Sequence, residues 1–544
     1  MESDLASWGV VEEAIEEDVG VCGPAGRRLR RLFRFASPPA PGAGVIREGY
    51  CSSLCSVSTP TPSPQEIAAQ LALGALDTHG ELIASLAQLF KTAGFRLALV
   101  GGPVRDAILG RLGNDLDFTT NARPEQTSAI LKKWADAIWD TGATFGTIAG
   151  KKGAVTVEIT TYRSESYDPH SRKPEVDFGD SIEGDLSRRD FTVNAMALEL
   201  TEEAPRFIDL FNGALDLAKK ILRTPGSAEA SFSDDPLRMM RAARFISQLD
   251  FSVDDEIVRA ITSMNERLSI ISAERIRDEF IKTVMSPNPR LGLRLLVETG
   301  LASQFLPELP KLKLEIDEHH HHKDVYEHTL TVLDQAIALE DRLGGPNLVI
   351  RLAALLHDIG KPRTRELIPG GGVSFHHHEV VGAKMTKKRL KELRFDSKTI
   401  DDVSTLVFLH LRFHGYGSGE WTDSAVRRYI RDAGDLLVHL HVLTRADCTT
   451  RNKRKADQLA STYDSLELRI SELMEEEELN RIRPDLNGEE IMELLGLKPS
   501  REVGEAYDYM LELRMERGPL DRDEAVQELL SWWSNKKLGA PEKS

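Results

Sequence analysis

The chain has 544 residues, a length that allows three or four domains, each with a core of its own. A hydrophobic content of 41% and a charged content of 28% are typical of globular proteins. No apolar run approaches the ~18 residues that a membrane helix needs. The acidic start does not fit a secretory signal peptide, and four scattered cysteines exclude a disulfide framework. We therefore expect a cytoplasmic protein with no membrane partner.

The formal net charge is −17, which at first argues against a nucleic-acid partner. RNA affinity, however, depends on Lys and Arg side chains close to phosphates and not on the total charge of the surface. Acidic runs such as Glu475 to Glu478 can lie far from any substrate. The charge therefore weakens an RNA-binding hypothesis without excluding it.

Composition and periodicity divide the chain into five expected parts. Residues 1–62 contain an arginine cluster and stretches rich in proline and serine, so we expect a disordered extension. A basic arm that touches RNA is the alternative for this part. An α/β head domain is expected over 63–225, and the pattern is helical from there on. The helical part is divided into a neck (226–315), a third domain (316–460) and a tail domain (461–544).

The head domain starts with helix and strand patterns in turn. From Gln65 to Leu89, apolar residues recur at helical spacing, and Gly94 is a signal for the end of a helix. The apolar stretch from Phe95 to Val100 predicts a short strand. Alternation from Lys151 to Tyr162 predicts another strand after glycine-rich turns.

The stretch LALVGGPVRDAILGRLGNDLDFTT, residues 97–120, carries the most chemical information. The expected strand ends at Gly101 and Gly102, where missing side chains let backbone N–H groups approach a triphosphate. A helix expected to begin near Val104 directs its positive end to the same anion. Arg105 is then placed to pair with phosphate oxygens.

Asp115 and Asp117 follow on an expected strand, where a spacing of two puts both carboxylates on one face. Such a pair can share two divalent ions, which activate an attacking 3′-hydroxyl and stabilise leaving pyrophosphate. An isolated Asp-x-Asp is more often a solvated turn, but the preceding glycine turn favours the catalytic interpretation. Glu158, on the alternating strand, is a candidate third carboxylate, and a solvated or structural Glu is an equal alternative.

Four further motifs follow in chain order. They are SRRDFTVNAM from Ser187, DLFNGALDL from Asp209, DDPLRMMRAARF from Asp234 and ISAERIRDEF from Ile271. With residues 97–120, they resemble the motifs of class II tRNA nucleotidyltransferases and bacterial poly(A) polymerases, in the polymerase-beta-like superfamily. The resemblance implies an α+β fold: a nucleotidyltransferase head with a mixed sheet and helices, followed by an all-α neck and further helical domains.

The DDPLRMMRAARF motif also has a physical interpretation. On a helix, Asp235 and Arg238 share a face, and Arg241 and Arg244 lie one further step each along it. Cytosine and adenine both present an exocyclic amine beside an acceptor nitrogen, so a carboxylate and a guanidinium can bind both bases. Guanine and uracil reverse this order. The resemblance implies that these positions select CTP and ATP; an ordinary salt-bridged helix is the alternative.

Two more features of the head depend on the resemblance. Arg189 and Asp190 match residues that contact the ribose or phosphates of the nucleotide, and a contact to the 2′-hydroxyl would favour NTP over dNTP. Residues 163–181 are polar and contain proline. They resemble the flexible loop that full CCA-adding members keep and CC-adding relatives lack, which favours addition of the terminal A by the same chain.

The third domain contains a series of metal-ligand side chains. They are His328, His357, Asp358, His378, His410 and Asp447. Histidine and aspartate on packed helices form metal sites of nitrogen and oxygen ligands. The series resembles the HD phosphohydrolase superfamily, in which His378 and His410 match the extra ligands of dinuclear members. It implies a divalent metal of open identity and hydrolysis of phosphomonoesters or 2′,3′-cyclic phosphates. The alternative is a domain that holds tRNA without turnover.

Together these features predict stepwise addition of C, C and A to the 3′ end of tRNA from CTP and ATP, with Mg²⁺ on Asp115 and Asp117. A poly(A) polymerase on the same scaffold is the nearest rival, and the lack of a basic C-terminal extension disfavours it. An HD phosphohydrolase with a non-catalytic, RNA-binding head is a rival of another class, which the two aspartates oppose. The run RNKRK, residues 451–455, is a candidate RNA contact or a solvated helix face. The oligomeric state stays open.

Overall fold

The computed structural model describes residues 62–140, 142–143, 146–166, 175–179, 181–314, 324–367, 373–415, 421–449, 452–477 and 483–538. The expected extension (all but its last residue), the centre of the expected loop over 163–181 and the first residue of the RNKRK run lie outside these residues. The chain divides into two compact units, which are described separately. The first runs up to Arg238 and includes Phe251–Ala260, and the second comprises Met239–Asp250 and the chain from Ile261 onward.

The first unit is built on a seven-stranded mixed sheet. In spatial order its strands are β3 (Ala137–Trp139), β4 (Thr147–Lys152), β5 (Val155–Thr161), β2 (Asp115–Thr120), β1 (Leu97–Val100), β8 (Met196–Glu199) and β9 (Arg206–Asp209). Strands β2 and β5 run parallel, and every other neighbouring pair is antiparallel. The four residues of β1 are fully buried, as expected for a central strand covered on both faces.

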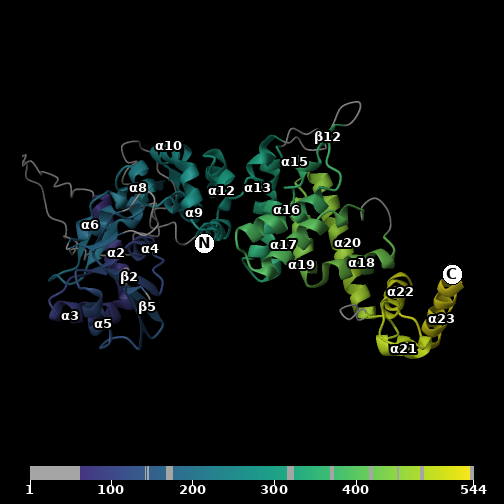
Figure 1. Cartoon of the computed structure of the whole chain (residues 1–544). Helices are drawn as coiled ribbons and strands as arrows, with labels where there is room; N and C mark the ends of the chain where they lie inside the picture. The colour runs from purple at the N-terminus through teal and green to yellow at the C-terminus, as the bar shows by residue number, and fades with distance from the viewer. Residues whose placement is uncertain are drawn as a thin grey trace, which may run out of the picture. The chain divides into compact units, whose positions relative to one another are not determined.

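The first unit also contains helices, several of which pack on this sheet. They are α2 (Pro64–Ala75), α3 (Gly80–Thr92), α4 (Gly102–Ile108), α5 (Pro124–Leu131), α6 (Ile182–Ser187), α7 (Gly213–Ala218) and α8 (Ala228–Asp234). Helix α4 packs against β1, β2 and β8, and α5 packs against β4 and β5 (Figure 1). Two small sheets complete the unit, one of β6 (Arg163–Ser166) with β7 (Glu175–Phe178) and one of β10 (Ile221–Leu222) with β11 (Ser252–Val253).

Two expected elements of the head differ in the structure. The helical run from Gln65 to Leu89 is two helices, α2 and α3, separated by a 3₁₀ turn at Leu76–His79. The expected strand from Lys151 to Tyr162 is the end of β4, a turn, and β5. Gly153 adopts a φ of +59° at this turn, a conformation that glycine reaches without strain, so the chain reverses there into a hairpin.

The second unit is helical. Its helices are α11 (Ala273–Val284), α12 (Pro289–Glu298), α13 (Val325–Ala338), α14 (Leu348–Leu356), α15 (Lys361–Thr364), α16 (His378–Glu392), α17 (Ser397–Leu409), α18 (Asp423–Ala433), α19 (Leu437–Asp447), α20 (Lys453–Glu477), α21 (Gly488–Leu495), α22 (Arg501–Arg517) and α23 (Arg522–Leu538). Helices α9 (Leu237–Leu249) and α10 (Asp255–Met264) cross the boundary between the units. Two antiparallel strands of two residues each, β12 (Glu366–Leu367) and β13 (Val373–Ser374), form its only sheet within the described chain.

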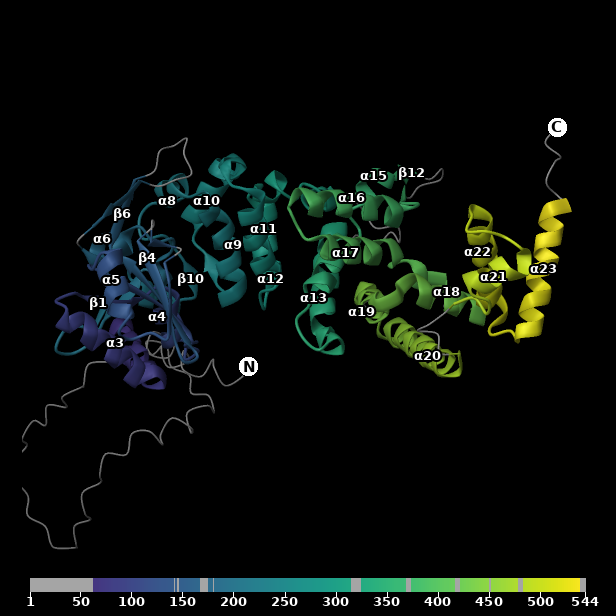
Figure 2. The same ribbon diagram turned by 60° about the horizontal axis from the view of Figure 1, so that its bottom comes forward.

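Helices α13, α14, α16, α17 and α19 pack on one another and form the body of the second unit. Helices α21, α22 and α23 surround a small core of their own, seen in yellow in Figure 2. This is the predicted fold class, a mixed-sheet head followed by helical domains. The division into five parts, with its boundaries, stays a prediction. Among the described helices, none combines the length and apolar character needed to cross a lipid bilayer.

Candidate active site and metal centre

The turn after β1 brings a glycine and an arginine from two different motifs together. Gly101 has φ +77° and ψ −134°, a region that only glycine occupies readily. A Cβ atom at this position would lie 2.8 Å from Nη1 of Arg189. Because Gly101 has no side chain, the Arg189 guanidinium can lie against the turn. Helix α4 starts directly at Gly102, not near Val104, and is only seven residues long.

The carboxylates of Asp115 and Asp117 lie on the same, exposed face of β2, because Leu116 between them is buried. Glu158 on β5 is also exposed and lies opposite Asp117 in the parallel ladder. The pKa of Asp117 is raised to about 6, first because surrounding protein atoms displace water and then because of the negative charge of Glu158. Neighbouring carboxylate oxygens whose mutual repulsion raises a pKa fit a divalent cation.

The guanidinium of Arg105, predicted to pair with phosphate, is bound by neighbouring side chains in this structure. Its guanidinium donates to both carboxylate oxygens of Asp106, at 3.0 and 2.8 Å, and to Oδ1 of Asn194 at 2.6 Å. Asn194 in turn donates to Asp190, which also accepts the N–H of Phe191 at 2.9 Å. Arg105 and Asp190 thus join the first two motifs, while their contacts to a nucleotide stay a prediction.

Asp235 and Arg238 are arranged differently from the expected shared helix face. Asp235 precedes Pro236, which disfavours helical backbone, and it is extended, with φ −137° and ψ 101°. Its carboxylate accepts the N–H of Leu237 at 3.0 Å and so caps α9. Arg238 is buried and donates to Oγ of Ser231 at 2.8 Å. The expectation that Asp235 lies on the helix is therefore wrong, although the backbone N–H of Arg238 still donates to the carbonyl oxygen of Asp235 at 3.0 Å.

Arg241 and Arg244, further along α9, belong to the second unit. Arg244 donates through Nε to Oε2 of Glu279 on α11 at 2.6 Å, and its guanidinium lies 4.1 Å from the centre of the Phe245 ring. Arg241 lies 5.6 Å from the same ring. These contacts tie α9 to α11, and a role of either arginine in nucleotide binding stays a prediction.

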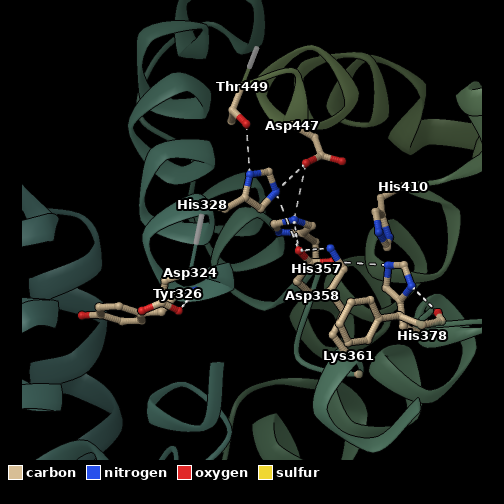
Figure 3. A network of polar contacts seen from close by, with 12 residues as sticks. Asp324, Tyr326, His328, His357, Asp358, Lys361, His378, His410, Asp447 and Thr449 are labelled. Atoms are coloured by element: carbon tan, nitrogen blue, oxygen red, sulfur yellow. Dashed lines mark hydrogen bonds and ion pairs between the residues drawn. The ribbon is translucent and has the colours of Figure 1, made fainter. Parts of the chain in front are cut away.

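The second unit brings the six predicted HD side chains together in two groups of three. Within each group the ligand atoms lie within 4.8 Å of one another. The first group is His328, His357 and Asp447, and the second is Asp358, His378 and His410. Figure 3 shows these rings and carboxylates converging from separate helices.

Three histidines of this centre are held in one orientation by a hydrogen bond through Nδ1. The Nδ1 atoms of His357, His378 and His410 each donate to the carbonyl oxygen three residues earlier, at 2.8, 2.8 and 2.7 Å. Because Nδ1 of each ring donates to the backbone, Nε2 faces the centre and offers its lone pair there whenever the ring is neutral. All three Nε2 atoms are buried and have no hydrogen-bond partner within the described chain. Such orphaned acceptors fit a metal ion.

Asp358 links the two groups. Its Oδ2 lies 3.2 Å from Nε2 of His357, and its Oδ1 lies 3.3 Å from Nε2 of His378. Oδ2 also lies 2.9 Å from Nζ of Lys361, three residues further on. In the first group, Oδ1 of Asp447 lies 2.9 Å from Nε2 of His328. The sequence reasoning missed Lys361, although its spacing from Asp358 is a local signal.

The charges in this centre suit metal binding. Burial, followed by the nearby His357, lowers the pKa of His410 to about 3 and keeps this ring neutral. Burial also acts to lower the pKa of His357, but the carboxylates of Asp358 and Asp447 outweigh it and raise the pKa to about 9. A metal ion can take the place of this proton between the same carboxylates. The residues therefore fit a divalent metal on nitrogen and oxygen ligands.

Three family models match the chain in order. Residues 97–223 match the poly A polymerase head domain, residues 250–312 match the probable RNA and SrmB-binding site of polymerase A, and residues 325–452 match the HD domain. A solved structure, the Bacillus stearothermophilus CCA-adding enzyme in complex with CTP, has the same fold. It has a TM-score of 0.58 and 24% identity over 85% of this chain and 99% of that chain.

Two relatives differ in how much of the chain they match. The CCA-adding enzyme of Lactobacillus helveticus is 42% identical over 216 residues, which is 40% of this chain and 52% of that protein. The match thus spans about half the length of that relative. The A-adding tRNA nucleotidyltransferase of Deinococcus radiodurans is 31% identical over 449 residues, 81% of this chain and 96% of that protein. The chain belongs to the family of tRNA nucleotidyltransferases and bacterial poly(A) polymerases, with an HD domain.

Proposed function

We propose that this chain adds C, C and A stepwise to the 3′ end of tRNA from CTP and ATP, without a nucleic-acid template. The observation that carries the proposal is the juxtaposition in the head. Asp115 and Asp117 lie on the exposed face of β2, and Arg189 lies against the Gly101 turn at the end of the neighbouring strand β1. Carboxylates for metal-assisted transfer and a guanidinium for phosphate thus come from adjacent strand ends.

In the proposed reaction the 3′-hydroxyl of the RNA is the nucleophile. The bond from O3′ to the α-phosphorus forms, the bond from that phosphorus to the oxygen of the β-phosphate breaks, and pyrophosphate leaves. Asp115 and Asp117 would hold two Mg²⁺ ions, which lower the cost of ionising the hydroxyl and of releasing pyrophosphate. Arg189 binds phosphate oxygens, and its Nε is buried with no hydrogen-bond partner within the described residues. No covalent enzyme intermediate forms.

Base selection is assigned to Asp235 and Arg238. The carboxylate would accept a hydrogen bond from the exocyclic amine of cytosine or adenine, and the guanidinium would donate to the ring nitrogen. The other predicted nucleotide-binding residues come from three of the motifs and belong to either unit. These are Gly101, Gly102, Arg105, Asp190, Arg241 and Arg244.

The test is a primer-extension assay with Mg²⁺ on three acceptors: tRNA lacking CCA, tRNA ending in CC, and an unstructured RNA. Each is offered CTP, ATP, both, or all four nucleotides, with Asp115→Ala/Asp117→Ala as the inactive control. Addition of three nucleotides to the first acceptor, and then a stop, supports the proposal. A long A tail on either kind of RNA with CTP ignored supports a poly(A) polymerase instead.

Addition of A alone is the second candidate, because the relative that matches 81% of the chain carries the name A-adding tRNA nucleotidyltransferase. The same assay separates the two. An A-adding enzyme extends tRNA ending in CC by one nucleotide and leaves tRNA lacking CCA unchanged when CTP and ATP are both present.

We further propose that the HD domain binds divalent metal and hydrolyses phosphomonoesters or 2′,3′-cyclic phosphates at an RNA end. The orphaned Nε2 atoms of His357, His378 and His410 support metal binding, and a bound metal would supply an activated water. The test compares wild type with His357→Ala for release of phosphate from a phosphomonoester, for opening of a 2′,3′-cyclic phosphate to a phosphomonoester, and for addition of C, C and A. Loss of hydrolysis with unchanged addition supports the proposal, and unchanged hydrolysis in a variant that no longer binds metal contradicts it.

A further inference from the structure

Asp185, which lies outside the five motifs, is buried beside the nucleotide site of the first unit. Its side chain has an exposed fraction of 0%. It lies on α6, whose apolar residues Ile182 and Leu186 pack with Ala98 and other residues of the central sheet. The sheet therefore fixes the position of α6, and with it the position of this carboxylate.

Both oxygens of Asp185 are bound by arginines of the second motif. Oδ1 accepts from Nε and Nη2 of Arg188 at 3.1 and 2.5 Å, and Oδ2 accepts from Nη2 of Arg189 at 3.1 Å. Burial acts to raise the pKa of Asp185, but the two guanidinium groups outweigh it and the net shift is downward. The carboxylate is therefore charged at neutral pH and holds both arginines.

Arg188 and Arg189 each contact a different part of the proposed nucleotide site. The guanidinium of Arg189 lies against the Gly101 turn, and its positive charge acts on Asp117. The carbonyl oxygen of Arg188 accepts a hydrogen bond from Nη2 of Arg238 at 2.6 Å. The buried carboxylate of Asp185 thus contacts Arg189, the proposed phosphate ligand, directly. Through Arg188 it is linked to Arg238, the proposed base ligand.

We propose that Asp185 is a positioning residue for nucleotidyl transfer, which holds Arg189 for the triphosphate and, through the backbone of Arg188, holds Arg238 for the base. The inference rests on the proposed function. An arginine fixed before the nucleotide arrives loses less side-chain entropy on binding than a mobile one, so fixing it raises affinity. Because one carboxylate holds both arginines, the distance between the phosphate contact and the base contact also stays constant.

The experiment compares the full-length Asp185→Asn and Asp185→Glu variants with wild type and with Glu199→Gln. Glu199 is a matched control, because its carboxylate is also buried and paired with two arginines, Arg96 and Arg206. It lies at the end of β8 away from Gly101, paired with Ala98. Measured quantities are KM and kcat for CTP and ATP on tRNA, incorporation of UTP and GTP, and the melting temperature.

We expect Asp185→Asn to raise KM for CTP and ATP about tenfold or more, the cost of leaving a buried ionic partner unpaired. Incorporation of UTP and GTP should rise as well, because Arg238 keeps its bond to Ser231 but its other partner, the backbone of Arg188, is held less firmly. Asp185→Glu should restore part of the affinity. Glu199→Gln should lower the melting temperature and leave KM and nucleotide choice near those of wild type.

Unchanged KM and nucleotide choice in a folded Asp185→Asn variant would overturn the inference, as would an equal rise of KM in Glu199→Gln. If Asp185→Asn does not fold, Asp185→Glu decides, and wild-type KM and choice in that variant count against the inference. Failure of the wild-type protein to extend any acceptor would instead overturn the proposed function.

Discussion

Asp117 and Glu158 lie directly opposite each other on the parallel strands β2 and β5, on the exposed face of the sheet. Two carboxylates in this position repel each other, and the repulsion helps to raise the pKa of Asp117 to about 6. The protein therefore holds a carboxylate that is costly to ionise where we propose that a cation binds. A bound cation removes this cost.

The apparent affinity for Mg²⁺ should fall as the pH falls below about 6. Because the pKa of Asp117 is raised, a proton competes with the metal there. At one pH unit below this pKa, the Mg²⁺ concentration for half-maximal nucleotide addition should be about tenfold higher than at neutral pH. In Glu158→Gln the midpoint should move to lower pH, since one source of the raised pKa is gone. An unchanged midpoint in this variant would contradict the assigned role of Glu158.

In the absence of metal, Asp117→Asn should stabilise the protein. A carboxyl group whose folded pKa is raised contributes stability below its ordinary value of 3.8, and this contribution is lost as the pH rises to about 6. The gain in melting temperature in EDTA should therefore grow between about pH 4 and pH 6 and then level off. A gain of constant size across this range would indicate a cause other than ionisation of Asp117.

A local pattern was sufficient to predict that Asp115 and Asp117 share one face, and the resemblance to the HD superfamily predicted the six His and Asp side chains that the structure groups together. The spacing of Asp115 and Asp117 on a strand fixes them on one face, and the HD ligands lie at or beside the ends of helices that pack together. The backbone at Asp235 was predicted wrongly because helical periodicity was extended past Pro236, although the proline itself predicts an extended residue before it. The extended backbone at Asp235 could therefore have been predicted from the sequence.

Other features depend on contacts between distant segments. The position of Glu158 opposite Asp117 follows from the register of β2 and β5, which one sequence does not specify. Asp185 has a local signal in its spacing to Arg188 and Arg189, but its burial depends on how α6 packs on the sheet. Glu158 was already a candidate third carboxylate, but its position opposite Asp117 and the burial of Asp185 could be recognised only once the tertiary structure was known.

Gly101→Ala should raise the KM for nucleotides, whereas a glycine substitution of similar backbone strain elsewhere should affect only stability. A non-glycine residue in this backbone conformation costs about 1–3 kcal/mol, and the new Cβ would meet Nη1 of Arg189 at 2.8 Å. Gly110→Ala is the matched control, because Gly110 has a similar φ of +71° but no atom near the added Cβ. Steady-state kinetics should show a higher KM for CTP and ATP in Gly101→Ala alone. Equal KM values in the two variants would mean that the displaced arginine does not bind nucleotide.

Arg238→Ala should relax nucleotide choice. Loss of the guanidinium removes the donor to the ring nitrogen of cytosine and adenine, a contact worth about 1–3 kcal/mol, or roughly tenfold or more in discrimination. Asp235→Ala should act in the same direction and should also lower the melting temperature, since the carboxylate caps α9. Competition between CTP and UTP on the same tRNA measures the effect. Retention of the wild-type preference in both variants would remove the basis for template-free base selection.

The HD domain should retain about two divalent ions per chain, because its ligands form two groups of three. The measurement is elemental analysis after gel filtration, made on the Asp115→Ala/Asp117→Ala background so that metal in the head does not contribute. His410→Ala should lower the content to about one ion, since only the second group loses a ligand. Asp358→Ala should lower it further, because the two oxygens of Asp358 lie near ligands of both groups.

His377→Ala is the control for these metal measurements. His377 is adjacent to His378 in sequence, but its side chain is 82% exposed and belongs to neither group. This variant should keep the full metal content, and none of the HD variants should alter addition of nucleotides to tRNA when the head is intact. Loss of metal from His377→Ala equal to that from His410→Ala would show that the ions bind surface histidines. A content of about one ion in the unaltered HD domain, unchanged in His410→Ala, would reduce the centre to the first group alone.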